Sequence, residues 1–140
     1  MKTLTLALQF AALTHLGLIA AGALMTRVVK LREHLVNLPP YIRQLFWVYI
    51  SFIGLCLVSF GIMTWVFADT LAAGGNLARG FCTFLTLFWT LRLVVAAFVF
   101  DVRPYVTNRW LWLGYQATKI VFTSLPIIYG LAAIQPSWIK

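Results

Sequence analysis

Acidic side chains are scarce in this chain. Its 140 residues include three Asp or Glu against 11 Lys or Arg, and charged residues make up only 10% of the total. A soluble domain has about a quarter of its residues charged, and a chain with far fewer would expose too much apolar surface to water. The composition therefore excludes a soluble monomer. It also excludes a disordered chain, since 62% of the residues are hydrophobic.

The patterns that carry catalysis or hold cofactors are also missing. The sequence contains no HExxH pair, no Walker or Rossmann glycine pattern and no pair of carboxylates suited to acid–base chemistry. Its two cysteines, Cys56 and Cys82, lie inside apolar segments and form no CxxC motif, so we expect them to be packing residues. Only one histidine lies inside an apolar segment, which argues against bis-histidine haem ligation. We predict a non-enzymatic protein without a metal or cofactor.

Long apolar segments dominate what is present. A membrane-spanning helix needs about 20 predominantly apolar residues, and four segments meet this length, at 3–26, 45–68, 77–100 and 110–134. The connections between them are short. We therefore predict an all-α fold, a four-helix integral membrane bundle that forms a single domain over residues 1–140 and has no soluble domain.

The fourth segment has an alternative placement. Residues 120–139 form an uncharged run, which would put Lys119 at the membrane interface. We favour 110–134, because the short connection 101–109 then suits a helical hairpin. Tryptophan and tyrosine, which prefer the interface, fit both placements.

Basic residues are concentrated in two of the connections. The segment 27–43 carries four Lys or Arg and the segment 101–109 carries two, against three in the remaining ends and connection. Positive charge favours the cytoplasmic side of a membrane, so we predict a basic cytoplasmic connection at 27–43 and both termini on the non-cytoplasmic side. The same orientation predicts that the first segment stays as a span and is not a cleaved signal peptide. We assign the net charge of +8 to contact with anionic lipid headgroups rather than nucleic acid.

Small residues recur at helical spacing and predict the packing seams. Helices in lipid associate where small side chains allow close approach. Such stripes occur in the first, second and third segments (Ala7, Ala11, Gly17, Ala21; Ser51, Gly54, Gly61, Thr64, Ala68; Gly80, Thr83, Thr86, Thr90, Ala97). If the threonine stripe of the third segment faces the bundle, Arg92 on its other side faces lipid or a partner subunit.

Three ionisable residues lie deep inside the predicted spans, namely His15, Arg92 and Lys119. Such residues are functional candidates, because charge is unfavourable in lipid. Lys119 shares the most polar stripe of the chain with Tyr115 and Gln116, and it falls at a depth similar to that of His15. We therefore expect these four residues to form one internal polar layer.

Two functions follow from these observations. We favour an accessory or scaffold subunit of a larger membrane assembly, whose partners are the lipid bilayer with its anionic headgroups and either another membrane protein or a second copy of the chain. Arg92 is the expected partner contact. The alternative is a transporter or binding bundle, in which the layer of His15, Tyr115, Gln116 and Lys119 holds an anionic or quinone-like small molecule.

Overall fold

The computed structural model describes residues 2–99 and 103–135, and within these ranges every regular element is a helix. Four long helices of 23 to 27 residues are long and apolar enough to cross a membrane, by length and composition. Three short elements connect them. In chain order the elements are α1 (Lys2–Val28), α2 (Leu31–Val36), α3 (Pro40–Val66), α4 (Ala68–Ala73), α5 (Asn76–Phe98), the 3₁₀ turn η1 (Arg103–Tyr105) and α6 (Arg109–Ile134).

The long helices confirm the four predicted apolar segments, with two refinements. The helix α3 starts at Pro40, five residues before the predicted start, because proline fits the first turn of a helix, where its missing N–H is not needed. The helix α6 covers the favoured placement of the fourth segment and continues through Pro126. Residue 100 of the third predicted segment, and residues 136–139 of the alternative fourth one, lie outside the described residues.

The predicted connection 27–43 is partly helical. Arg27 belongs to the last turn of α1, Arg43 to the first turns of α3, and α2 lies between them. The chain leaves α1 through Lys30, whose φ of 48° places it in the left-handed region and separates α2 from α1. At the next connection Gly74 and Gly75, with φ of 81° and 142°, adopt backbone conformations that favour glycine.

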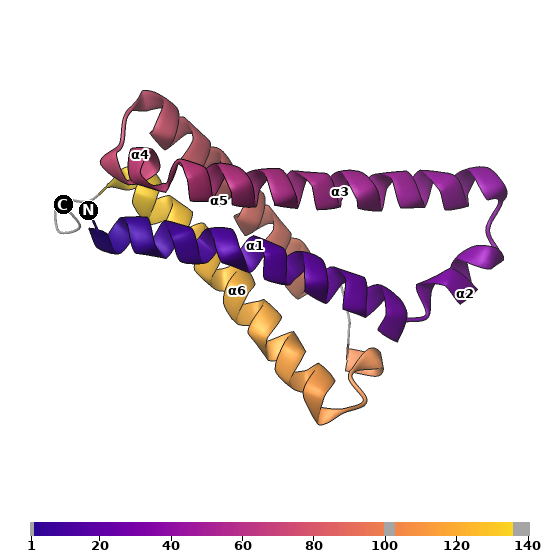
Figure 1. Cartoon of the computed structure of the whole chain (residues 1–140). Coiled ribbons are helices and arrows are strands. Elements are labelled where there is room, and N and C mark those ends of the chain that lie inside the picture. The colour runs from indigo at the N-terminus through magenta and orange to yellow at the C-terminus, as the bar shows by residue number, and fades with distance from the viewer. Residues whose placement is uncertain (1, 100–102, 136–140) are drawn as a thin grey trace.

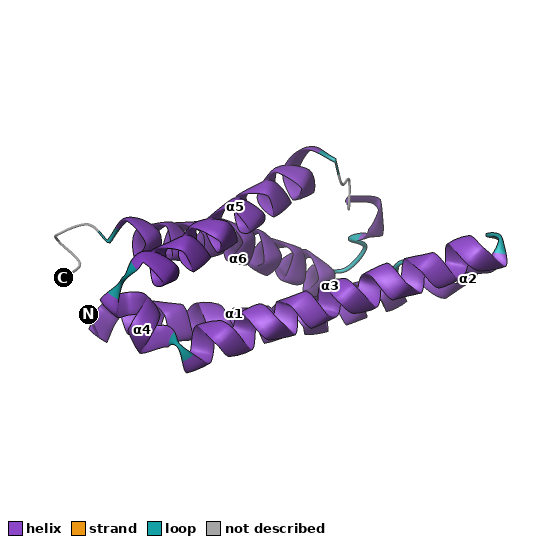
Figure 2. Cartoon of the chain, turned by 90° about the horizontal axis from the view of Figure 1, so that it is seen from above, coloured by secondary structure: helices purple, strands orange, loops and turns teal. Residues whose placement is uncertain are grey.

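The helices form two hairpins that meet at one end. The helix α1 packs mainly against α3, and α5 against α6, while α1 also contacts α6 and α4. Figure 1 shows that the hairpins converge beside α4, where α1 begins and α6 ends, and that α3 and α6 diverge toward the other side. The view from above also shows the two hairpins separating, with the α5 ribbon diverging from α1 and α3 (Figure 2).

Burial is concentrated where the hairpins meet. We call this region the packed end (residues 4–15, 61–72, 78–89 and 125–135), and the rest of the described chain the open end. The buried side chains lie in the packed end, with Leu35 of α2 as the exception among the described residues. The largest fully buried side chains are Trp89, Tyr129, Leu8, Leu85 and Leu125.

The face of α5 that packs is turned from the predicted one by about a third of a turn around the helix axis. The buried residues of α5 are Ala78, Cys82, Leu85 and Trp89, whereas most of the threonine stripe is exposed. The reason is that a threonine in a helix satisfies its hydroxyl locally, as Thr90 does by donating to the Thr86 carbonyl over 2.7 Å. The hydroxyl groups of the stripe therefore need no partner helix, although Thr86 lies beside Gly130 of α6, and large side chains fill the interior.

Candidate functional site at the packed end

His15 lies where α1 and α3 approach each other closely. Its side chain is fully buried, and its neighbours Ala11 and Ala12 are small. A Cβ atom added at Gly61 would stand 3.2 Å from the His15 Cβ and 3.3 Å from the Ala12 carbonyl oxygen. Gly61 therefore allows α3 to reach α1 at this level, as small residues do in membrane helix pairs.

The imidazole of His15 is satisfied on one side only. Its Nδ1 lies 2.7 Å from the Ala11 carbonyl oxygen, and because a carbonyl only accepts, Nδ1 carries the proton and donates it. The Nε2 atom is then an acceptor, and it has no hydrogen-bond partner among the described residues. His15 thus keeps an unused lone pair inside the bundle.

Trp89 of α5 places an unused donor near this acceptor. Its ring stands nearly perpendicular to the imidazole of His15, with 5.2 Å between the ring centroids. The indole Nε1 is buried and also lacks a partner in the described part of the chain. One donor and one acceptor therefore remain unpaired in the same apolar region, and an unpaired buried polar group is unfavourable by about 1–3 kcal/mol.

A hydrogen bond between α3 and α6 completes the group. The hydroxyl groups of Thr64 and Tyr129 lie 2.8 Å apart, both buried, and the Tyr129 ring is 6.2 Å from that of His15. We call His15, Thr64, Trp89 and Tyr129 the His15 cluster. Each of the four long helices contributes one residue to it.

The His15 cluster consists of side chains that donate or accept hydrogen bonds. In the described ranges, no group of three or more His, Cys, Asp or Glu residues could hold a metal ion. His15 Nε2 is left to accept a hydrogen bond and Trp89 Nε1 is left to donate one. The hydropathy pattern indicated His15 as a functional candidate but indicated no polar role for Trp89 or Tyr129.

The predicted polar layer is not assembled. Lys119 is exposed at the open end, with its Nζ 4.1 Å from the centre of the Tyr115 ring on the same helix, and Gln116 is half-buried beside it. His15 instead contacts α6 at Tyr129, ten residues further along, which is a rise of about 15 Å. His15 is therefore separated from Tyr115, Gln116 and Lys119.

Arg92 faces α6 of its own hairpin. It is exposed, and its guanidinium carbon lies 5.8 Å from the centre of the Phe122 ring. The prediction that Arg92 points away from its own bundle was therefore wrong, because the buried face of α5 is the one that continues into Arg92. An exposed arginine over an aromatic ring gains about 0.5–1 kcal/mol.

Comparisons with known protein families, with curated proteins and with solved structures give no match for this chain.

Proposed function

We propose that this protein is a non-enzymatic accessory subunit of a larger membrane assembly, bound to other transmembrane helices through glycine-bearing outer faces. The observation that supports this is the position of its helical glycines. At five of them a Cβ atom would meet nothing within 4 Å (Gly17, Gly22, Gly54, Gly80 and Gly114).

Glycine is an unfavourable residue in the interior of a helix unless close packing requires it. It lowers helix stability by about 1 kcal/mol relative to alanine in water, and in membranes its use is to let backbones approach closely. Gly61 and Gly130 serve that purpose within the chain, since a Cβ there would meet His15 and Thr86 respectively. The other five have no such neighbour in the described part of the chain, which supports close packing against helices of another subunit.

The experiment compares bulky substitutions on one helix. Gly114→Leu and Ala117→Leu both add an exposed side chain to α6, but only the first removes a glycine. In intact membranes, a cross-linked assembly containing this chain should be lost in Gly114→Leu and kept in Ala117→Leu. The same comparison applies to Gly54→Leu on α3 with Ile53→Leu as its control. The proposal would be overturned if the chain gave no cross-linked product in membranes and purified as a monomer in mild detergent.

The orientation in the membrane is part of the proposal. The open end carries Arg27, Lys30, Arg32 and Arg43, and positive charge favours the cytoplasmic side. The open end then faces the cytoplasm, and the ends of α1 and α6 beside α4 face the other side. A single cysteine introduced at His34 in a Cys56→Ser, Cys82→Ser background should react with an impermeant thiol reagent only after the membrane is opened.

One observation favours the second candidate, a small-molecule binding bundle. The unpaired Nε2 of His15 and Nε1 of Trp89 would together hold a small molecule with one donor and one acceptor. His15→Leu should then remove a compound that copurifies with the wild-type protein, as detected by mass spectrometry of the extracted material. An identical extract from both proteins would exclude this candidate.

A further inference from the structure

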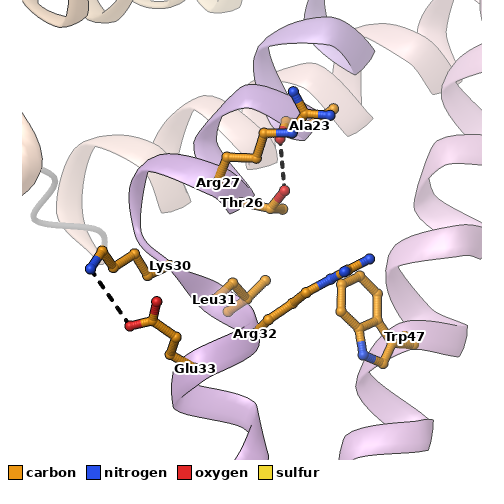
Figure 3. Close-up of a pocket in the computed structure, with 8 residues that line it drawn as sticks. All are labelled: Ala23, Thr26, Arg27, Lys30, Leu31, Arg32, Glu33 and Trp47. Atoms are coloured by element: carbon orange, nitrogen blue, oxygen red, sulfur yellow. Dashed lines mark hydrogen bonds and ion pairs between the residues drawn. The ribbon is translucent and has the colours of Figure 1, made fainter.

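A cleft at the open end gathers positive charge where α1, α2 and α3 meet. Its volume is about 500 Å³, and its lining includes Arg27 from α1, Lys30 and Arg32 from the α2 region, and Trp47 from α3. Figure 3 shows these side chains around the cleft. Unlike the His15 cluster, this site is built from charged groups at the end of the long helices.

Two of the cations in the cleft have no acidic partner. Lys30 turns toward Glu33, with 3.7 Å between its Nζ and the carboxylate, and both side chains are largely exposed. Arg27 and Arg32 form no ion pair with any described residue. Three cations and one carboxylate leave the cleft with two net positive charges, which suits an anion.

The helix α3 contributes the aromatic side chain of Trp47 to the wall of the cleft. Trp47 lies seven residues after the start of α3, a rise of about 10 Å, and tryptophan prefers the membrane–water interface. Arg32 extends from α2 toward Trp47 (Figure 3). A second cleft of about 290 Å³ shares Arg32 and Trp47 and adds Arg43, together with the apolar Leu35 and Val36. The second cleft therefore places apolar side chains beside Arg32, Arg43 and Trp47.

We propose that this cleft is a binding site for an anionic phospholipid, whose phosphate is held by Arg27 and Arg32. One guanidinium group can donate two parallel hydrogen bonds to two oxygens of a phosphate. An ammonium group does not reproduce this geometry. Trp47 and the neighbouring apolar side chains lie where the glycerol and the upper acyl chains of such a lipid would rest. A soluble anion would bind the arginines but would make no apolar contact with Trp47 and its neighbours.

The left-handed turn at Lys30 explains how the two arginines come to share one cleft. In a continuous helix Arg27 and Arg32 would point about 140° apart around the axis, which places them on different faces. The φ of 48° at Lys30 ends α1 and redirects α2 toward α3. Both arginines then line the same cleft.

The test uses the full-length protein with phosphatidylglycerol and phosphatidylcholine, followed by native mass spectrometry and titration in detergent. We expect phosphatidylglycerol adducts on the wild type. In the double variant Arg27→Gln, Arg32→Gln the affinity should fall about 25-fold, at about fivefold for each cation near an anionic lipid. The variant Arg27→Lys, Arg32→Lys, which retains the charge but not the paired geometry, should show an intermediate loss.

The control is Arg109→Gln. Arg109 is an exposed cation at the start of α6, on the same side of the protein but outside the cleft. Phosphatidylglycerol affinity should be unchanged in this variant, and circular dichroism should show the same helix content in all variants. An equal loss of affinity per removed charge in Arg109→Gln and in the double variant, or no loss in the double variant, would overturn the proposal. Full competition by millimolar inorganic phosphate would also overturn it in favour of a soluble anion.

Discussion

The packed end and the open end contain the same four apolar helices, yet only one of them forms a core. At the packed end, small residues such as Ala11, Ala12 and Gly61 bring the helices into contact, and large side chains fill the space around that crossing. Straight helices that cross at an angle must separate beyond the crossing. In lipid no hydrophobic force draws them back, because acyl chains contact apolar side chains as well as another helix does.

This comparison predicts the largest effect at the crossing itself. Gly61→Leu should lower the free energy of unfolding in mixed detergent by about 3 kcal/mol, because its side chain has to displace His15 or the Ala12 backbone. Gly54→Leu lies two turns earlier on α3, where a Cβ meets nothing, and should leave the stability of the isolated chain unchanged. Similar losses in the two variants would show that the ends do not differ in packing.

The second effect concerns the short helix α4 at the packed end. The side-chain amide nitrogen of Gln135 donates to the carbonyls of Leu71 and Ala72, over 3.3 and 3.2 Å. Gln135→Ala leaves both carbonyls without this donor, so we expect a loss of about 2 kcal/mol. Hydrogen exchange should accelerate in α4 but not in α2. Exchange that stays unchanged in α4 would contradict this role of Gln135.

A smaller effect is expected from the hydrogen bond between Thr64 and Tyr129. Tyr129→Phe should destabilise the protein by about 1 kcal/mol, within the range measured for such bonds between membrane helices. The double variant Thr64→Val, Tyr129→Phe should lose less than the sum of the single variants, since each single change already breaks the bond. Strict additivity would mean that the bond contributes nothing.

The smallest effect belongs to the open end. Lys119→Met should change the free energy of unfolding by less than about 0.5 kcal/mol, because the side chain is exposed and lies over the Tyr115 ring of its own helix. The variant should insert in the same orientation as the wild type, as judged by thiol labelling. A large loss of stability would place Lys119 in a core that the described residues do not show.

The sequence was sufficient to predict features that depend on composition along one helix. The four apolar segments follow from hydropathy, and the burial of His15 follows from its small neighbours Ala11 and Ala12. The proline at position 40 marks the region where α3 starts, although the first turn of the helix includes it.

Features that depend on how helices face each other could not be predicted. The choice between the threonine stripe and the Trp89 face of α5 depends on whether hydroxyl groups bond to their own helix or to another one. The separation of Lys119 from His15 depends on where α1 crosses α6, and equal depth in the membrane does not determine that position. The two hydrogen bonds of Gln135 join residues more than 60 positions apart.

The contact between Gln135 and α4 also has a consequence for biosynthesis. A helix leaves its last carbonyls unpaired, and at α4 two carbonyls near its end receive their donor from a residue just after α6. The Gln135 amide lies against Gly74, where any side chain at position 74 would collide with it. Because α6 follows α4 in the chain, α4 reaches its final set of hydrogen bonds only after α6 has been synthesised and has packed beside it.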